Sequence, residues 1–240
     1  MSGRQTIEQY INTIYNIDCL EFMKKLPDNC IDCIVTDPPY GINFVSSRTT
    51  RKEALQNDKL WDWQQLVNAM LPEFKRILTD TGCCCCCCGG GGTPVTAMLT
   101  MEVVKHFNLI QTLVWKKFIG LGWNYRPSYE NILIFSKSKN DYNFYDTSKK
   151  CSNVIENINQ DIPNSEEHPT QKPIRLMNKL LQIHTLENHI VFDPFGGMGT
   201  TYLSCIEFKR RYIGCEINKN YYEKTLERIK KAQAQGMLEL

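Results

Sequence analysis

The sequence Ile31-Asp32-Cys33-Ile34-Val35-Thr36-Asp37-Pro38-Pro39-Tyr40 joins a largely apolar run to an acid, two prolines and a tyrosine. The run predicts a buried strand that ends at Asp37. Both prolines have a fixed φ and lack an N–H group, so they predict a rigid turn after that strand. Open α/β folds bind their ligands at the carboxyl ends of the strands. We therefore expect Asp37 and Tyr40 to lie at a ligand site on the carboxyl edge of a sheet.

The same turn indicates which ligand would fit. The Asp37 carboxylate and the Pro38 carbonyl are two neighbouring acceptors, and together they can take both hydrogens of an amino group. The ring of Tyr40 can stack on a flat partner. A nucleobase with an exocyclic amine meets both demands. The alternative is a plain strand-to-turn corner that carries a surface tyrosine.

A second segment, residues 190–201, reads Ile-Val-Phe-Asp-Pro-Phe-Gly-Gly-Met-Gly-Thr-Thr. It predicts a strand that ends at Asp193, then a glycine-rich turn and a helix over about 198–208. The next predicted strand, 211–216, ends in Glu216, about 20 residues past the turn, which is where an acid reaches a ribose hydroxyl in nucleotide-binding folds. Thr200 follows Gly199 directly, so the lysine of a triphosphate-binding loop is missing. The expected ligand is a nucleoside with a carboxylate tail.

Three ordered motifs carry a resemblance to a known family: Asp37 to Tyr40, His168 to Pro173 (His-Pro-Thr-Gln-Lys-Pro), and Asp193 to Thr200. Over residues 14–229 the chain resembles the amino-group DNA methyltransferases that use S-adenosyl-L-methionine. Because the catalytic motif precedes the cofactor motif, the order is similar to that of the β class. The chain departs from the family at residues 83–92, where six cysteines and four glycines replace an apolar, β-branched run.

The fold expected is α/β. Strands are predicted at 13–17, 31–36, 83–88, 109–115, 129–135, 187–192 and 211–216, with helices between most of them, which favours a doubly wound, mostly parallel sheet. The resemblance implies a seven-stranded, Rossmann-like methyltransferase fold, circularly permuted and with one antiparallel strand. It also implies a single domain over 1–240. Within it, 13–135 carries the catalytic motif, 136–167 is a short target-recognition insert, and 168–234 binds the cofactor.

The resemblance also implies an activity: methyl transfer from S-adenosyl-L-methionine to N6 of an adenine that has left the double-stranded DNA helix. The catalytic residues would be Asp37, Pro38, Pro39 and Tyr40. N4-cytosine methylation uses the same geometry and stays open. So does a DNA-binding module with impaired catalysis, because the 83–92 segment is unusual. The cofactor residues implied are Asp18, Cys19, Lys172, Pro173, Asp193, Phe195, Gly197, Gly199, Thr200 and Glu216.

The chain has a net charge of +2, which does not by itself indicate nucleic-acid binding. DNA contacts must then come from local cations beside the catalytic turn. A polar loop after Phe44 and an aromatic-rich segment after the 109–115 strand are the candidates, although a solvated loop and an ordinary hairpin are the alternatives. The cations nominated are Arg48, Arg51, Lys52, Lys116, Lys117 and Arg126. At the opposite edge of the sheet, Lys209, Arg210 and Arg211 are expected to form a solvated cluster.

The chain has twelve cysteines, of which six are consecutive at 83–88 and six are scattered. Cys30 and Cys33 form one C-x-x-C pair, but no second pair lies at zinc spacing. Buried, reduced thiols are therefore expected, with no metal site. The sequence shows no run of 18 apolar residues and no secretory leader, so we expect a cytoplasmic protein without a membrane partner. A homodimer and a cognate restriction endonuclease are left open as protein partners.

Overall fold

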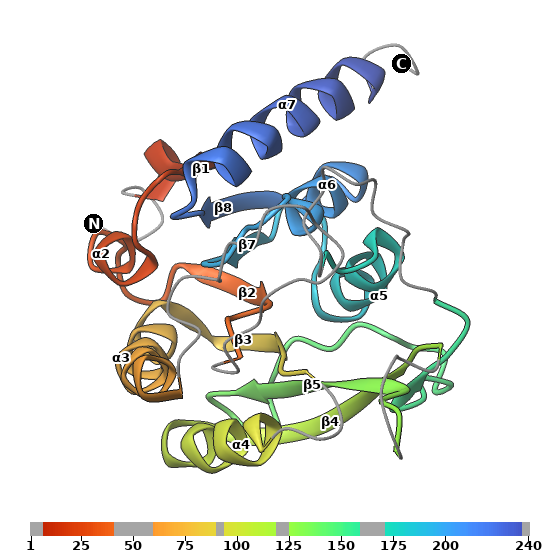
Figure 1. The fold of residues 1–240 in the computed structure, drawn as a ribbon. Coiled ribbons are helices and arrows are strands. Elements are labelled where there is room, and N and C mark those ends of the chain that lie inside the picture. Colours follow the sequence, from red (N-terminus) through yellow and green to blue (C-terminus); the bar gives the residue numbers. More distant parts are fainter. Residues whose placement is uncertain (1–6, 41–59, 90–93, 119–124, 159–170, 237–240) are drawn as a thin grey trace.

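A computed structural model describes residues 7–40, 60–89, 94–118, 125–158 and 171–236. Its centre is one eight-stranded sheet with the order β1-β8-β7-β2-β3-β5-β4-β6 (Figure 1). The seven predicted strands are all present, which confirms the doubly wound, mostly parallel fold. The strands are β1 (Thr13–Tyr15), β2 (Ile31–Thr36), β3 (Leu78–Cys87), β4 (Asn108–Lys116), β5 (Tyr129–Ser136), β6 (Val154–Ile155), β7 (Ile190–Asp193) and β8 (Arg211–Cys215).

The eighth strand, β6, was not predicted. It has two residues, too few to show a periodic pattern, and it pairs parallel to β4. β5 runs antiparallel to both of its neighbours, β3 and β4. The first residues of β5 therefore lie at the same edge of the sheet as the last residues of the parallel strands. This reversal brings part of β5 to the candidate site.

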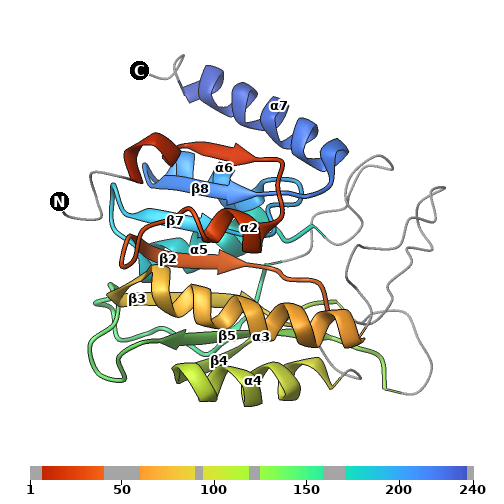
Figure 2. The same cartoon turned by 90° about the vertical axis from the view of Figure 1, so that its left-hand side faces the viewer.

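Helices cover both faces of the sheet (Figures 1 and 2). The helices α2 (Cys19–Met23), α3 (Leu60–Ile77) and α4 (Val95–His106) pack into one apolar cluster, and α5 (Ile174–His184), α6 (Thr200–Glu207) and α7 (Lys219–Gly236) pack into the other. A short 3-10 helix, η1 (Glu8–Tyr10), precedes β1. No helix in the described residues is both long and apolar enough to cross a membrane.

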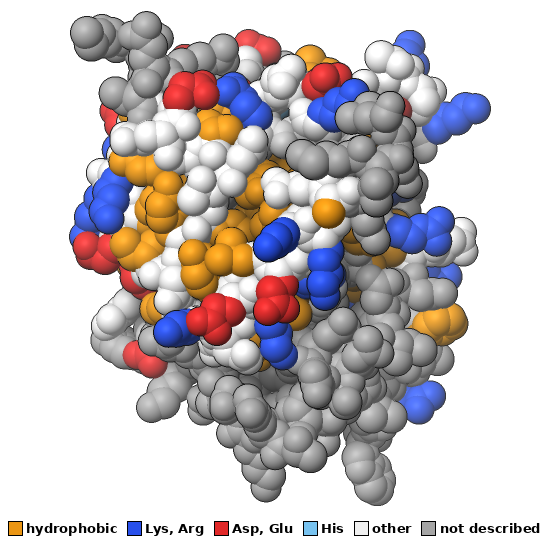
Figure 3. All heavy atoms as spheres, turned by 90° about the horizontal axis from the view of Figure 1, so that it is seen from above, with side chains coloured by type: hydrophobic (Ala, Val, Ile, Leu, Met, Phe, Trp, Pro, Cys, Tyr) orange, Lys and Arg blue, Asp and Glu red, His pale blue; other side chains and the backbone are white. Residues whose placement is uncertain are grey.

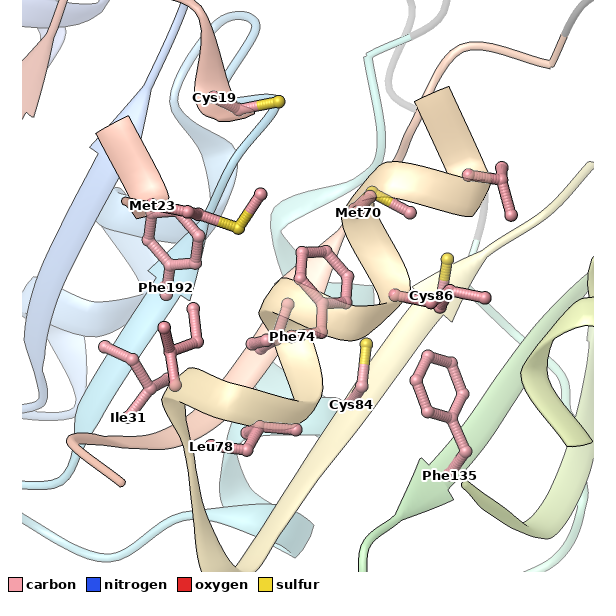
Figure 4. Packing of buried hydrophobic residues seen from close by; sticks show 14 of the residues in the cluster. Cys19, Met23, Ile31, Met70, Phe74, Leu78, Cys84, Cys86, Phe135 and Phe192 are labelled. Carbon is pink, nitrogen blue, oxygen red and sulfur yellow. The ribbon is translucent and has the colours of Figure 1, made fainter. Parts of the chain in front are cut away.

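The cysteine run forms the second half of β3, from Cys83 to Cys87, and Cys88 follows the end of the strand. This strand begins at Leu78, earlier than predicted, and it pairs with β2 and β5. Side chains alternate along a strand, so Cys84 and Cys86 face the α3 side, whereas Cys83, Cys85 and Cys87 face the α5 side (Figure 4). A central strand buried on both faces needs apolar residues throughout, and buried cysteine supplies them.

On the α5 side, the Sγ atoms of Cys33, Cys83 and Cys85 lie within 4.8 Å of one another. This grouping could not be expected from sequence spacing, because it joins neighbouring strands. All three side chains are fully buried. Hydrogen bonding to Cys33 acts to lower the pKa of Cys85, but Cys83 and burial outweigh it, so the pKa is raised. Burial raises the pKa of its neighbour Cys84, and both thiols behave as small apolar groups of the core.

Candidate active site

Four acids gather at the carboxyl edge of the sheet. Asp18 follows β1, Asp37 follows β2, Asp193 ends β7, and Glu216 follows β8. Those four strands are parallel, with β2 bonded to β7, β7 to β8, and β8 to β1. The sequence prediction that these acids lie at the edge where α/β folds bind ligands therefore agrees with the structure.

The catalytic turn is held by a lysine from a distant part of the chain. The Nζ of Lys172 lies 2.5 Å from Oδ2 of Asp37 and 3.0 Å from the hydroxyl oxygen of Tyr40. That hydroxyl in turn donates a hydrogen bond to Oδ1 of Asp37. Pro38 is buried and Pro39 is half-buried, so the turn is anchored on the sheet. The structure thus brings Lys172 to the catalytic motif, whereas the sequence placed it with the cofactor residues.

Gly89, just after β3, leaves room for the tyrosine ring. Its φ is +71°, and a Cβ at this position would lie 3.3 Å from two carbon atoms of the Tyr40 ring. A larger residue would be strained in this left-handed conformation and would press on the ring. Gly89 therefore helps to define where Tyr40 lies.

One charged residue of this site, Glu130, was missed by the sequence analysis, and Lys117 was assigned to DNA rather than to this site. Oε2 of Glu130, at the start of β5, lies 3.4 Å from Nζ of Lys172, and Oε1 lies 2.5 Å from Nζ of Lys117. The Glu130 side chain is only 15% exposed. The missing signal was the direction of β5: in an antiparallel strand the first residues, not the last, lie at the ligand edge.

The pKa values of this cluster follow from burial and from the pairing of opposite charges. Burial acts to lower the pKa of Lys172, but the carboxylates of Asp37 and Glu130 outweigh it, so the pKa of Lys172 is raised. Burial acts to raise the pKa of Glu130, but Lys172 and Lys117 lower it overall. At neutral pH Lys172 is therefore an ammonium and Glu130 is ionised.

Asp37 and Tyr40 shift in the other direction. Burial raises the pKa of Asp37 above its ordinary range, and the Lys172 ammonium opposes that shift. Burial and the nearby carboxylate of Asp37 raise the pKa of Tyr40, which keeps its hydroxyl protonated and able to donate. Removal of Lys172 would leave Asp37 with burial and with the negative charge of Glu130, and both favour the neutral carboxyl.

The glycine turn is tied to Glu216. The N–H of Gly197 donates to Oε2 of Glu216 over 2.7 Å, and the N–H of Asn218 donates to Oε1 over 2.7 Å. Gly197 has φ +50° and Gly199 has φ +78°, a conformation that side chains rarely adopt. A Cβ at Gly197 would meet open space, with the nearest atom 4.0 Å away. The backbone of this turn is thus accessible beside a buried carboxylate.

Asp193 lies beneath this turn and is 4% exposed. Its Oδ1 accepts from the N–H of Phe195 over 3.0 Å, and its Oδ2 accepts from Oγ1 of Thr201 over 2.7 Å. Burial raises the pKa of Asp193 to about 7, although both hydrogen bonds oppose the shift. Asp193 is therefore a structural support of the turn that can change charge near neutral pH.

The remaining cofactor candidates lie along the same edge. Asp18 caps α2, with Oδ1 accepting from the N–H groups of Leu20 and Glu21 over 2.9 and 3.2 Å, and Cys19 is buried. Thr200 is the buried first residue of α6. Pro173 is the N-cap of α5, with ψ 139°. The helix starts one residue later because that extended backbone cannot be part of it.

The DNA candidates fall into two groups. Arg48, Arg51 and Lys52 lie outside the described residues. Of the others, Arg126 is exposed, Lys116 pairs at the surface with Glu156 over 2.8 Å, and Lys117 is only 20% exposed and pairs with Glu130. The face seen in Figure 3 mixes Lys and Arg with Asp and Glu around apolar side chains. That mixture agrees with the near-zero net charge.

The expectation of a solvated cluster at 209–211 was wrong. The guanidinium of Arg210 donates to the side chain and the carbonyl of Thr185 over 2.9 and 2.8 Å, and burial lowers the pKa of Arg210. Arg211 donates to Glu8 over 2.9 Å. These side chains connect the end of α5 and the N-terminal segment to β8, and only Lys209 is exposed.

Comparison with known proteins identifies the family. The sequence profile of the DNA methylase family, which covers N6 and N4 methyltransferases, matches residues 31–227. The chain belongs to this DNA methylase family. The matched range includes the catalytic turn, the Lys172 segment and the glycine turn. The resemblance drawn from the three motifs is thus confirmed.

Individual relatives agree with this membership. The DNA methylase chain is 28% identical to type II methyltransferase M.HpaI of Haemophilus parainfluenzae in an alignment of 231 residues, which covers 88% of this chain and 72% of the relative. It is 27% identical to the DNA adenine methyltransferase YhdJ of Escherichia coli, over 90% of this chain and 82% of the relative. Both comparisons include most of the chain.

Solved structures give the same result for the fold. The M1.HpyAVI–SAM complex is 27% identical and has a TM-score of 0.69, with 90% of this chain and 98% of that chain covered. The cytosine-N4-specific PvuII DNA methyltransferase has a TM-score of 0.71 at 19% identity, with 92% and 90% covered. The second likeness concerns the fold alone.

Proposed function

We propose that this DNA methylase transfers a methyl group from S-adenosyl-L-methionine to the exocyclic N6 of an adenine that is flipped out of double-stranded DNA. The observation that carries the proposal is the position of the Asp37-Pro38-Pro39-Tyr40 turn. It lies at the same sheet edge as the turn from Asp193 to Thr200 and as Glu216. A carboxylate for an amine and a turn for a nucleoside thus share one edge.

The residues at the β7–β8 end fit the cofactor. Glu216 is a buried carboxylate after the strand that follows the glycine turn, in the position that suits a ribose hydroxyl. Gly197 keeps the backbone beside it open. Asp18 and Cys19 would hold the adenine end of the cofactor, and Asp193, Phe195, Gly199, Thr200 and Pro173 its methionine end. When bound, S-adenosyl-L-methionine supplies an activated methyl group. M1.HpyAVI, a relative of this chain, has been solved with that cofactor.

At the β2 end, the residues of the chain prepare the amine. The Asp37 carboxylate and the Pro38 carbonyl accept its two hydrogens and make the nitrogen lone pair more available. Tyr40 provides a ring against which the base can stack. Methyl transfer makes the amine nitrogen cationic, and the negative charge of Asp37 stabilises it. The site therefore contributes position and electrostatics, without a covalent intermediate on the protein.

The choice of adenine rests on two points. The residue before Pro38 is an aspartate rather than a serine, which favours adenine over cytosine in this family. The relative YhdJ is an adenine methyltransferase by name, and it matches 90% of the chain. N4-cytosine methylation is the second candidate, because its amine would be bound by the same acceptors.

Analysis of methylated bases tests the proposal directly. Unmethylated genomic DNA is incubated with the full chain and S-adenosyl-L-methionine that carries a labelled methyl group, and the digested nucleosides are separated by mass. Label in N6-methyladenine is expected; label in N4-methylcytosine alone would contradict the adenine assignment.

The Asp37→Ala variant tests the role of the catalytic turn. It should lose methyl transfer while its affinity for S-adenosyl-L-methionine, measured by calorimetry, changes little. If the wild-type chain binds DNA but does not bind the cofactor and transfers no labelled methyl group, it would instead be a DNA-binding module without catalysis.

A further inference from the structure

The ammonium of Lys172 lies where a bound amine would be expected. It donates to Oδ2 of Asp37 over 2.5 Å, while the hydroxyl of Tyr40 donates to Oδ1. Both oxygens of the catalytic carboxylate thus have a donor from the protein itself. Each oxygen has a second lone pair, but a base amine that approaches Asp37 competes with these donors for the same carboxylate.

Glu130 provides a second acceptor for the lysine. Its Oε2 is buried, makes no hydrogen bond among the described residues, and lies 3.4 Å from Nζ of Lys172. Its Oε1 is held by Lys117 over 2.5 Å, which fixes the orientation of the carboxylate. A buried carboxylate oxygen without a hydrogen bond is costly, and the ion pair with Lys172 offsets that cost only in part. A shift of less than one ångström would complete that hydrogen bond.

We propose that Lys172 and Glu130 are positioning residues: the ammonium of Lys172 moves between the carboxylate of Asp37 and the carboxylate of Glu130. Nζ of Lys172 holds Asp37 until the target base arrives, and then moves onto Oε2 of Glu130 and frees Oδ2 of Asp37 for the amine. This inference rests on the proposed function, since it assigns the order of contacts at that same site. Lys172 and Glu130 thus orient Asp37 and do not touch the methyl group.

The charges around the site favour such an exchange. The ammonium remains between two carboxylates throughout, so no charge has to leave the protein or become unpaired. Lys172 is protonated in both positions and therefore has no lone pair with which to accept a methyl group itself. The other titratable groups that face Asp37 are Tyr40, the thiols of Cys86 to Cys88 on and after β3, and Asp193 on β7.

A double-mutant cycle tests the exchange. The four proteins are wild type, Glu130→Gln, Lys172→Gln and the double variant. Their kcat/KM for unmethylated genomic DNA is measured at saturating S-adenosyl-L-methionine and on the alkaline plateau of each protein's own pH profile, where Asp37 is ionised. Glu130→Gln should lower kcat/KM roughly tenfold or more, mainly through the KM for DNA, because Lys172 then has nowhere to move. Adding Lys172→Gln should restore several-fold of that loss, because the competitor for Asp37 is gone.

The pair of Glu102 and Lys105 on α4, 2.8 Å apart, is the matched control, with Glu102 16% exposed and Lys105 exposed. The same glutamine substitutions there should leave kcat/KM unchanged. Lys172→Gln alone should also move the acid limb of the pH profile upward, because Asp37 loses its cation. Multiplicative losses in the Glu130–Lys172 cycle, with no rescue, would overturn the proposal.

Spectroscopy of the wild-type chain covers the case in which a variant does not fold. The Nζ signal of Lys172 is followed by NMR in lysine-labelled protein while DNA is added with S-adenosylhomocysteine. A shift of that signal is expected, and an unchanged signal would refute the movement. Label transfer by the wild type separates the two claims: its absence refutes the proposed function, whereas transfer without rescue refutes only the exchange.

Discussion

Asp193→Asn should make the stability of the protein less dependent on pH. Burial raises the pKa of Asp193 from an ordinary value of 3.8 to about 7. The folded state thus binds a proton more tightly than the unfolded state, and the free energy of unfolding falls as the pH rises between those values. The difference corresponds to roughly 4 kcal/mol, present at pH 4 and lost above pH 7.

The asparagine keeps both hydrogen bonds, since its oxygen can accept from Phe195 and its amide can donate to Thr201. Urea unfolding of both proteins between pH 4 and 8 gives the difference in free energy at each pH. Relative to wild type, the variant should gain stability as the pH rises, and the gain should level off near pH 8. Asp141→Asn, at an exposed position, is the control and should give a flat difference. An equally flat difference for Asp193→Asn would refute the raised pKa of Asp193.

Two further predictions concern ligands. Glu216→Ala should weaken the binding of S-adenosyl-L-methionine by about 1.5–3 kcal/mol, the range for a hydrogen bond to a charged group, and unchanged calorimetry would exclude Glu216 from the ribose site. Neutralising Arg48, Arg51 and Lys52 should weaken DNA binding and lower its salt slope by about one for each phosphate that the protein no longer neutralises. The control triple consists of exposed lysines at the opposite edge, Lys75, Lys139 and Lys209, and its DNA affinity should equal that of wild type.

Much of the fold could be predicted because its strands end in chemically distinctive residues. Asp37 and Asp193 each follow an apolar run, so both the strand and its end could be located from sequence. The strands that lead to Asp18 and Glu216 were located in the same way, and the other three by their runs of apolar residues or cysteine, with errors of a few residues at their ends. The prediction placed the start of β3 at Cys83. The strand begins at Leu78, because backbone pairing with Ile31 extends it through polar residues.

The partners of the catalytic turn could not be predicted in the same way. Lys172 precedes α5 and Glu130 begins β5, and both are far from Asp37 in sequence. Nothing in their local pattern shows that they meet Asp37, because the contact depends on the strand order and on the reversed direction of β5. The error at Arg210 has the same cause, because Arg210 contacts Thr185, a residue that lies 25 positions away in the sequence.

The acids at the carboxyl edge of the sheet are stabilised in two different ways. At the β7–β8 end, the donors to Glu216 within the described part of the chain are backbone N–H groups, and Asp193 accepts from a backbone N–H and a hydroxyl. These donors are fixed by the fold, so a ligand there must fit the geometry that they define. At the β2–β5 end, Asp37 and Glu130 are neutralised by the side chains of Lys172 and Lys117, and side chains can move. A site that must bind a cofactor repeatedly in one position benefits from the first arrangement. A site that must admit and release a flipped base benefits from the second, because the resident cation can give way to the incoming amine.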